Sequence, residues 1–162
     1  AEDHEGHSHD EEAEYDEHIW LSLRNAQLLV GAIADALGQL DPDHAQAYAD
    51  HAAAYCRQLE ALDADYQAAV DAGTVDTLLF GDRFPFRYLV DQLGLPAVLT
   101  IENSDQRVAQ TIVQNTADRS AAILTIDSMQ AVNAGDVEAG VSYLSLMEQN
   151  LDVLRQALGC AA

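Results

Sequence analysis

Apolar residues recur at alternating steps of four and three from Ile19 onward, which is the spacing of one face of an α-helix. A first stripe comprises Ile19, Leu23, Ala26, Val30, Ile33, Leu37 and Leu40, and a second comprises Tyr48, Ala52, Tyr55, Leu59, Leu62, Tyr66 and Ala69. Asp41 and Pro42 separate the stripes, because aspartate favours a helix cap and proline a first helical position. The sequence therefore predicts two long helices, with Gly73 as the stop of the second.

After Gly73 the pattern changes to short apolar runs that alternate with helical segments. We expect strands over 77–80, 97–101 and 122–126, and helices over 84–93, 103–115 and 136–158. Strands that alternate with helices form parallel sheets, whose ligands bind beyond the carboxyl ends of the strands. The predicted fold class is therefore α/β, with long backbone helices followed by a small parallel sheet flanked by helices. Asp82, Glu102 and Asp127 each lie just past an expected strand.

The first fifteen residues, AEDHEGHSHDEEAEY, contain no apolar side chain larger than alanine before the final tyrosine. Such a segment cannot bury enough surface to offset the entropy of ordering. Neutral imidazoles at His4, His7 and His9 can close on one cation, and the surrounding carboxylates raise its local concentration. We predict a flexible, metal-binding loop over 1–15. The alternative is a solvated acidic tail whose histidines are incidental.

The net charge of −21, from 28 acidic against 7 basic residues, restricts the possible partners. It excludes nucleic acid, which needs a basic face, and disfavours anionic lipid, whereas cations suit such a field. No apolar run approaches the ~18 residues of a membrane span, so no direct membrane insertion is expected. The chain starts without methionine or a signal sequence, which suggests a processed or excised fragment. Cys56 and Cys160 could form one bridge; otherwise Cys56 is a buried thiol in a helix.

Four motifs carry a resemblance to a known family. Residues 16–26 read DEHIWLSLRNA, similar to the family pattern D-P-H-x-W-L-S-P-x-N-A, and residues 40–48 read LDPDHAQAY, similar to L-D-P-x-N-A-x-x-Y. Residues 125–129 and 140–144, TIDSM and GVSYL, are similar to T-L-D-x-L and G-x-x-Y-L. The chain thus resembles the C-terminal half of a zinc-binding solute-binding protein of an ABC importer, of the cluster A-I type. A histidine- and acid-rich loop before the first motif also occurs in zinc-handling members.

The resemblance implies two α/β lobes joined by a long backbone helix, with the metal in the cleft between them. It divides the chain into the histidine-rich loop over 1–15, the end of the first lobe with the linking helices over 16–72, and a C-terminal α/β lobe over 73–162. Two metal ligands carry over onto matching positions, His18 and Asp127.

The sequence departs from the family pattern in three ways. The first lobe, which supplies one histidine ligand, has no counterpart. A second histidine is expected in F-H-D-x-F, but this chain has Gly81 at that position. The stretch around 91–94 is shorter than in the family, as after an internal deletion. Asp82 or Glu102 could complete the site, although helix capping explains both residues adequately.

A histidine nitrogen and a carboxylate oxygen suit Zn²⁺, which normally takes four ligands. Together with this chemistry, the resemblance implies extracytoplasmic capture of Zn²⁺, in the periplasm or at the cell surface, and delivery to the membrane permease of an ABC importer, without catalysis. Mn²⁺ is the rival ion, a metal-dependent hydrolase is the rival class, and a scaffold without a competent site is a third reading. His44 and His51, seven apart on the second helix, are expected to face solvent.

Overall fold

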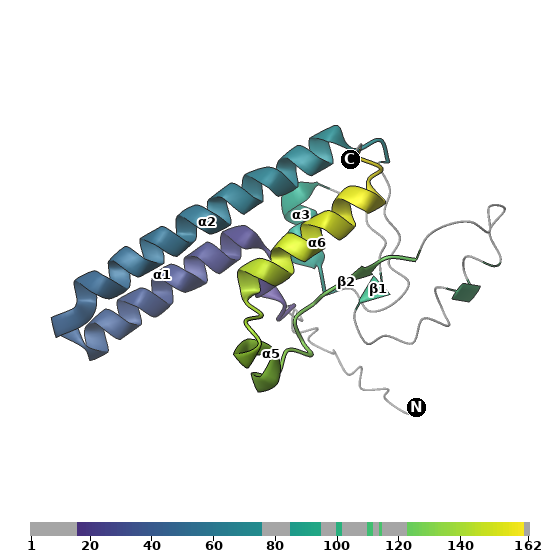
Figure 1. Ribbon diagram of the computed structural model, residues 1–162. Coiled ribbons are helices and arrows are strands. Elements are labelled where there is room, and N and C mark those ends of the chain that lie inside the picture. The colour runs from purple at the N-terminus through teal and green to yellow at the C-terminus, as the bar shows by residue number, and fades with distance from the viewer. Residues whose placement is uncertain are drawn as a thin grey trace, which may run out of the picture.

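The computed structural model describes residues 16–75, 85–94, 100–101, 110–111, 114 and 123–160. A 3₁₀ turn, η1 (Ile19–Leu21), leads into helix α1 (Leu23–Leu40), and a second, η2 (Pro42–His44), leads into α2 (Ala45–Ala72). The two helices lie side by side over their length, and one end of the pair projects away from the remaining elements (Figure 1). The two predicted long helices are confirmed.

Local chemistry explains where these helices begin and end. The Ser22 hydroxyl caps α1 by accepting a hydrogen bond from the Asn25 backbone N–H at 3.2 Å. Pro42 stands at the start of η2, where its missing N–H costs nothing. Gly73 follows α2 as its C-cap, as the sequence predicts, and its N–H bonds the Val70 carbonyl at 3.1 Å.

Two short strands, β1 (Thr100–Ile101) and β2 (Thr125–Ile126), pair in parallel with Thr100 opposite Thr125. Each falls inside a predicted strand, so the parallel sheet is confirmed for these two. Helix α3 (Arg87–Leu93) lies inside the predicted helix over 84–93 and ends at Gly94, whose φ of 68° is left-handed. The expected strand over 77–80 lies outside the described residues, as does most of the helix over 103–115.

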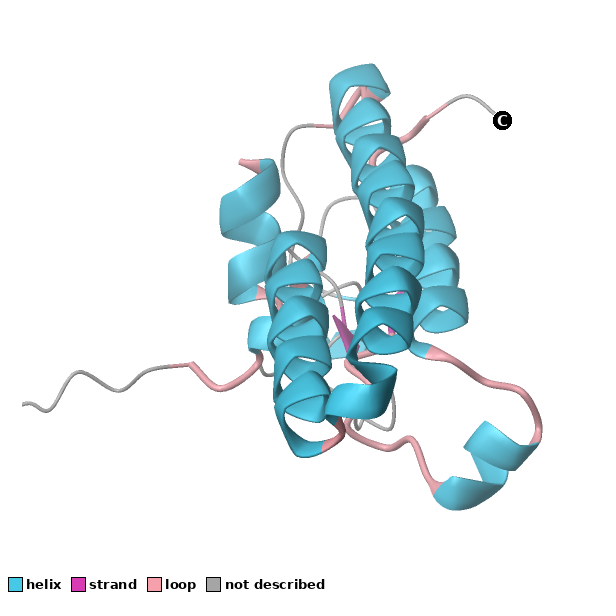
Figure 2. Cartoon of the chain, turned by 90° about the vertical axis from the view of Figure 1, so that its left-hand side faces the viewer, coloured by secondary structure: helices cyan, strands magenta, loops and turns pink. Residues whose placement is uncertain are grey.

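The predicted single helix over 136–158 is wrong, because the chain forms two helices there. Helix α5 (Ala134–Glu138) is followed by a break and then by α6 (Tyr143–Ala157). Gly140 adopts a φ of 91°, its N–H bonds the Val137 carbonyl, and the next N–H reaches back to the Asp136 carbonyl at 3.0 Å. This Schellman arrangement ends a helix. Ser142 then caps α6. Figure 2 shows α5 standing apart from the long helices.

The core lies where the proximal half of the helix pair meets α3, β2 and α6. Its buried members are Leu21, Leu23, Ala26, Leu59, Leu62, Tyr66, Ala69, Phe86, Leu89, Leu93, Ile126, Met147, Leu151, Leu154 and Leu158. The Tyr66 hydroxyl donates to the Met147 carbonyl at 2.7 Å and so ties α2 to α6. Burial raises the pKa of Tyr66 well above its usual value.

Beyond this core the helix pair forms a projecting arm with apolar residues on its surface. The stripe predicted on the first helix is buried at Leu23 and Ala26, but Ile33 is 59% exposed and Leu40 is 83% exposed.

Both cysteines are free thiols, and Cys56 is half-buried rather than buried. Among the described residues, no helix has both the length and the apolarity needed to cross a bilayer.

Candidate metal centre

His18 stands directly before η1, at the point where the described chain begins. Its ring Nδ1 lies 2.8 Å from Asp16 Oδ1, and its backbone N–H donates to the same oxygen at 2.9 Å. The Tyr88 hydroxyl donates to the Asp16 carbonyl at 2.9 Å, which ties this segment to α3. The Trp20 ring lies 5.3 Å from the His18 ring, centroid to centroid. His18 is therefore held by neighbours on both sides, and its side chain keeps 17% of its surface exposed.

Asp127 follows β2 directly, as predicted, and begins a tight turn that we call the 127–130 turn. One carboxylate oxygen, Oδ1, accepts a hydrogen bond from the Met129 backbone N–H at 2.6 Å. Met129 has a φ of 64°, the left-handed conformation that non-glycine residues adopt only rarely. A carboxylate has two oxygens and about four acceptor directions, so one that caps a backbone N–H can in general also be a metal ligand.

The segment around His18 and the 127–130 turn lie against each other, although more than a hundred residues of chain separate them. The Trp20 indole N–H donates to the Ser128 carbonyl at 3.2 Å. The Gln130 side-chain nitrogen contacts His18 Nε2. From α6, the Tyr143 hydroxyl donates to the Trp20 carbonyl at 2.7 Å. The two predicted ligands are thus carried by neighbouring segments. That they share one ion stays a prediction.

These contacts assign the two nitrogens of His18 different roles. A carboxylate only accepts hydrogen bonds, so the proton on Nδ1 points to Asp16, and Nε2 presents its lone pair towards Gln130. Metal-binding histidines commonly donate their other N–H to a carboxylate in this way. Burial raises the pKa of Asp16, but the hydrogen bonds from the His18 backbone N–H and ring, aided by the charge of Arg87, outweigh it and place that pKa below its usual value.

The structure also brings together residues that the sequence analysis did not single out as ligands. Possible ligand atoms of Asp16, Glu17 and His18 all lie within 4.8 Å of one another, and Asp127 is not part of this described group. Asp16 could have been noticed from its position two residues before a histidine. The Gln130 side chain contacts His18, and the Asn150 amide bonds the backbone N–H and carbonyl of Asp127. Neither residue gave such a signal, because these contacts depend on a turn and a helix that meet only in the fold.

The other predicted site residues have different outcomes. His44 and His51 are exposed, as predicted, and His44 Nδ1 lies 2.9 Å from Asp41 at the tip of the arm. The remaining candidates, His4, His7, His9, Asp82 and Glu102, lie outside the described residues, as does Gly81, where a ligand histidine was expected.

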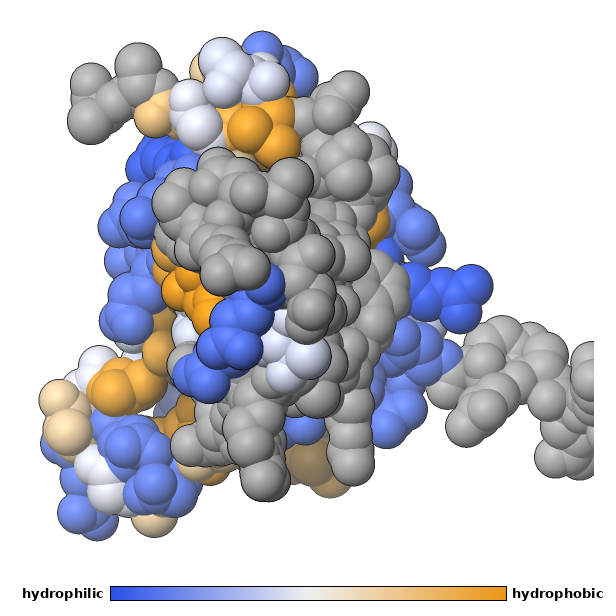
Figure 3. Space-filling model, turned by 90° about the vertical axis from the view of Figure 1, so that its right-hand side faces the viewer, coloured by the Kyte–Doolittle hydropathy of each residue, from blue (hydrophilic) through white to orange (hydrophobic). Residues whose placement is uncertain are grey.

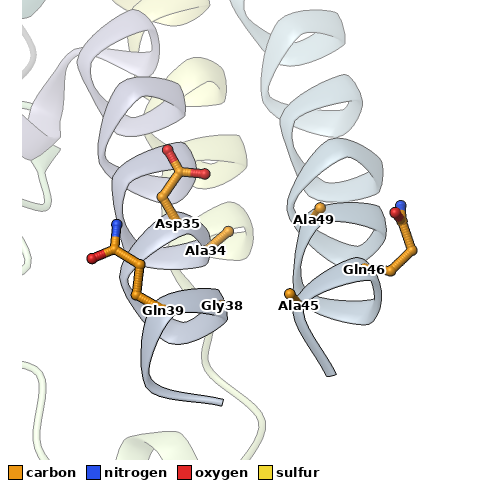
Figure 4. A pocket seen from close by; sticks show the side chains of 7 residues that line it. All are labelled: Ala34, Asp35, Gly38, Gln39, Ala45, Gln46 and Ala49. Atoms are coloured by element: carbon orange, nitrogen blue, oxygen red, sulfur yellow. The ribbon is translucent and has the colours of Figure 1, made fainter. Parts of the chain in front are cut away.

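Hollows in the described part of the chain differ in what their linings offer to a metal. One of about 320 Å³ lies beside the candidate site, lined by apolar residues that include Trp20, Met129, Val137 and Leu146. Another, of about 460 Å³, lies between α1 and α2 in the arm. Figure 4 shows Ala34 and Ala49 facing each other across it, and Asp35 is its one ionisable lining residue. This second hollow therefore lacks a set of metal ligands.

The sheet side of the molecule carries hydrophilic surface. Figure 3 views this side and shows hydrophilic residues at both borders of the face, together with smaller hydrophobic patches. A chain with a net charge of −21 raises the local concentration of cations around such a surface.

Comparison with known proteins identifies similar sequences. Residues 1–103 match the family described as zinc-uptake complex component A, periplasmic (ZnuA). The zinc-binding lipoprotein AdcA of Streptococcus pneumoniae is 29% identical over an alignment of 180 positions that covers 94% of this chain and 35% of that protein. The high-affinity zinc uptake system protein ZnuA of Brucella abortus is 34% identical over 95 residues, 58% of this chain and 28% of that protein. The chain spans about a third of the length of AdcA.

Solved structures confirm the fold. Zn(II)-bound AdcA from Streptococcus pneumoniae superposes with a TM-score of 0.73 at 24% identity, covering 90% of this chain and 37% of that one. The laminin-binding protein Lbp of Streptococcus pyogenes gives a TM-score of 0.77 at 23% identity, covering 89% of this chain and 65% of that one. At these identities the likeness concerns the arrangement of helices and strands.

Proposed function

Because the chain belongs to the zinc-uptake complex component A family, which its residues 1–103 match, we propose that it captures Zn²⁺ outside the cytoplasm. In this proposal the ion is the cargo, passed on to the membrane permease of an ABC importer, and the protein catalyses no reaction.

The observation that carries the proposal is the contact between the His18 segment and the 127–130 turn. His18 presents Nε2 towards Gln130, in the same turn that begins with the Asp127 carboxylate. An imidazole nitrogen and a carboxylate oxygen at about 2.0–2.2 Å are ordinary zinc ligands. Zinc normally takes four ligands, so two remain to be supplied. We propose that His4, His7 and His9 concentrate the ion and can contribute ligands.

Zinc is preferred over manganese because of the donor types. Imidazole suits zinc, whereas carboxylate, carbonyl and water oxygens suit manganese. His18 with the three tail histidines gives this chain a nitrogen-rich set. The names of AdcA and ZnuA also refer to zinc.

Capture rather than catalysis is favoured by the surroundings of the site. A zinc hydrolase needs a general base and a polar substrate pocket beside the metal. The hollow beside Trp20 has a lining of mostly valine, methionine, leucine and aromatic residues.

The proposed cellular location and the proposed partner, the permease of an importer, are supported by the family. Its description includes the word periplasmic, and AdcA is named a lipoprotein. We therefore propose an extracytoplasmic location, with 1–15 as the metal-collecting loop, 16–72 as the end of a first lobe with its linking helices, and 73–162 as the C-terminal lobe.

The experiment is a calorimetric zinc titration of the full chain in which His4, His7 and His9 are replaced by alanine, which we call the tail-silenced chain. His18→Ala and Asp127→Ala should each weaken the remaining site at least tenfold, because each removes a ligand from an already incomplete set. His44→Ala is the matched control, since that histidine is exposed on the arm and should leave affinity unchanged. A tail-silenced His18→Ala or Asp127→Ala chain that binds zinc like its parent would contradict the proposal, as would tighter binding of Mn²⁺ than of Zn²⁺.

A further inference from the structure

Asn150 lies on α6, and both polar groups of its buried side-chain amide form hydrogen bonds with the backbone of one residue, Asp127. Its side chain is 1% exposed. Its Oδ1 accepts a hydrogen bond from the Asp127 backbone N–H at 2.7 Å, and its Nδ2 donates to the Asp127 carbonyl at 2.8 Å. Asp127 stands just past β2, where the strand pairing has ended. The amide therefore supplies Asp127 with the pair of bonds that a neighbouring strand would otherwise provide.

A buried asparagine is a costly choice for packing alone. The core face of α6 is otherwise apolar, with Met147, Leu151 and Leu154 at 3% exposure or less. Burying an amide in such surroundings costs free energy unless its hydrogen bonds are satisfied. Here both polar groups of the amide are used, and the bonds they make fix the position and orientation of the residue 127 backbone.

Fixing that backbone also fixes where the carboxylate can point. The Asp127 side chain bonds the Met129 N–H at 2.6 Å, and Met129 holds a left-handed φ of 64°. On the far side of the turn, Trp20 donates to the Ser128 carbonyl. The turn is therefore clamped from α6 at one end and from the His18 segment along its length. Freeing the α6 end would let the carboxylate move relative to His18.

We propose that Asn150 is a positioning residue for metal capture, which places the Asp127 carboxylate at the distance and angle that a zinc ion requires. This inference rests on the proposed function, in which Asp127 is a ligand. Asn150 does not touch the ion. It acts through the backbone of Asp127, as outer residues that orient metal ligands do.

The test is a double-mutant cycle in the tail-silenced chain, with zinc affinity measured by competition against a chromophoric chelator. Asn150→Ala should weaken zinc binding about 10–100-fold, the usual effect of removing a residue that orients a ligand. In the Asp127→Ala background the same substitution should change affinity less than about twofold, because the ligand it positions is gone. Asn150→Leu keeps the volume of the side chain and should reproduce the loss if the alanine variant folds poorly.

Leu154→Ala is the matched control on the same face of α6. It should lower the melting temperature of the metal-free chain, since Leu154 is 3% exposed, but leave zinc affinity unchanged. Asn150 would have only a structural role if its replacement weakened zinc binding equally with and without Asp127, or left it unchanged where Asp127→Ala weakens it. If Asp127→Ala alone left affinity unchanged, the ligand assignment itself would fail, and the positioning role with it.

Discussion

Replacing Trp20 by phenylalanine tests whether the His18 segment is held on the 127–130 turn by the indole N–H. The substitution removes one hydrogen bond, to the Ser128 carbonyl at 3.2 Å, and keeps an aromatic ring beside His18. A hydrogen bond of this kind contributes about 1 kcal/mol, and the lost indole area adds roughly as much again. We expect the free energy of unfolding to fall by about 1–2 kcal/mol, and zinc affinity in the tail-silenced chain to fall about fivefold, the equivalent of the hydrogen bond alone.

Urea unfolding measures the change in the free energy of unfolding. It is followed by far-ultraviolet circular dichroism rather than by fluorescence, because the substitution removes the only tryptophan. Calorimetric titration with zinc measures the change in zinc affinity. Tyr66→Phe is the matched control, since it removes a single hydrogen bond of 2.7 Å between α2 and α6 that involves neither the His18 segment nor the 127–130 turn. It should cost about 1 kcal/mol of stability and leave zinc binding unchanged. Equal effects of the two variants on zinc affinity would refute the proposed link between Trp20 and the site.

Two further predictions concern the fold. Burial raises the pKa of Tyr66 in the folded chain, so the unfolded chain releases the Tyr66 proton at a lower pH than the folded chain does. The contribution of Tyr66 to the free energy of unfolding is therefore complete below pH ~10, and it is lost as the pH rises from that value towards the folded pKa. Tyr143 and Tyr55, whose pKa values burial also raises, contribute to the decline in stability of both the parent and Tyr66→Phe. In that range the free energy of unfolding should therefore fall more steeply in the parent than in Tyr66→Phe, by about 1.4 kcal/mol per pH unit; a parallel decline in both chains would contradict it. Leu62→Ala should cost about 2–5 kcal/mol in urea unfolding because Leu62 is 6% exposed, whereas Ile33→Ala, at 59% exposure, should cost about 0.5 kcal/mol or less; similar losses would show that the arm is packed.

The spacing of the apolar residues, with the break at Asp41 and Pro42, was sufficient to predict the two long helices, because that spacing extends over several turns. The end of α2 was predicted from a single glycine, Gly73. Gly94 ends α3 in the left-handed conformation that is typical of a helix C-terminus. The same reasoning failed at Gly140, where the apolar spacing continues through the break and suggests one helix. The φ of 91° there and the Ser142 cap that follows decide the outcome locally.

The apolar stripe of α1 did not allow us to predict which of its residues are buried. Leu23 and Leu40 belong to the same spacing, yet one is fully buried and the other is 83% exposed. What differs is the neighbour: α3 and α6 cover only one end of the helix pair (Figure 1). A periodic pattern reveals which residues share a face but not which part of that face another element covers.

Some residues of the candidate site could be predicted from the sequence, and others could not. His18 and Asp127 came from the family resemblance, and the structure places their segments in contact. Gln130 and Asn150 could not be predicted, because a polar residue in a turn or on a helix acquires its role from what the fold places opposite it. Asp16 is intermediate, since its partner is only two residues away.

The most direct test of the central claim is a crystal of the tail-silenced chain grown with Zn²⁺ and measured at the zinc absorption edge. The anomalous difference map should show one ion about 2.0–2.2 Å from both His18 Nε2 and a carboxylate oxygen of Asp127, with Gln130 displaced from the imidazole. An ion bound instead by Asp16 and Glu17, with none between His18 and the 127–130 turn, would contradict the account.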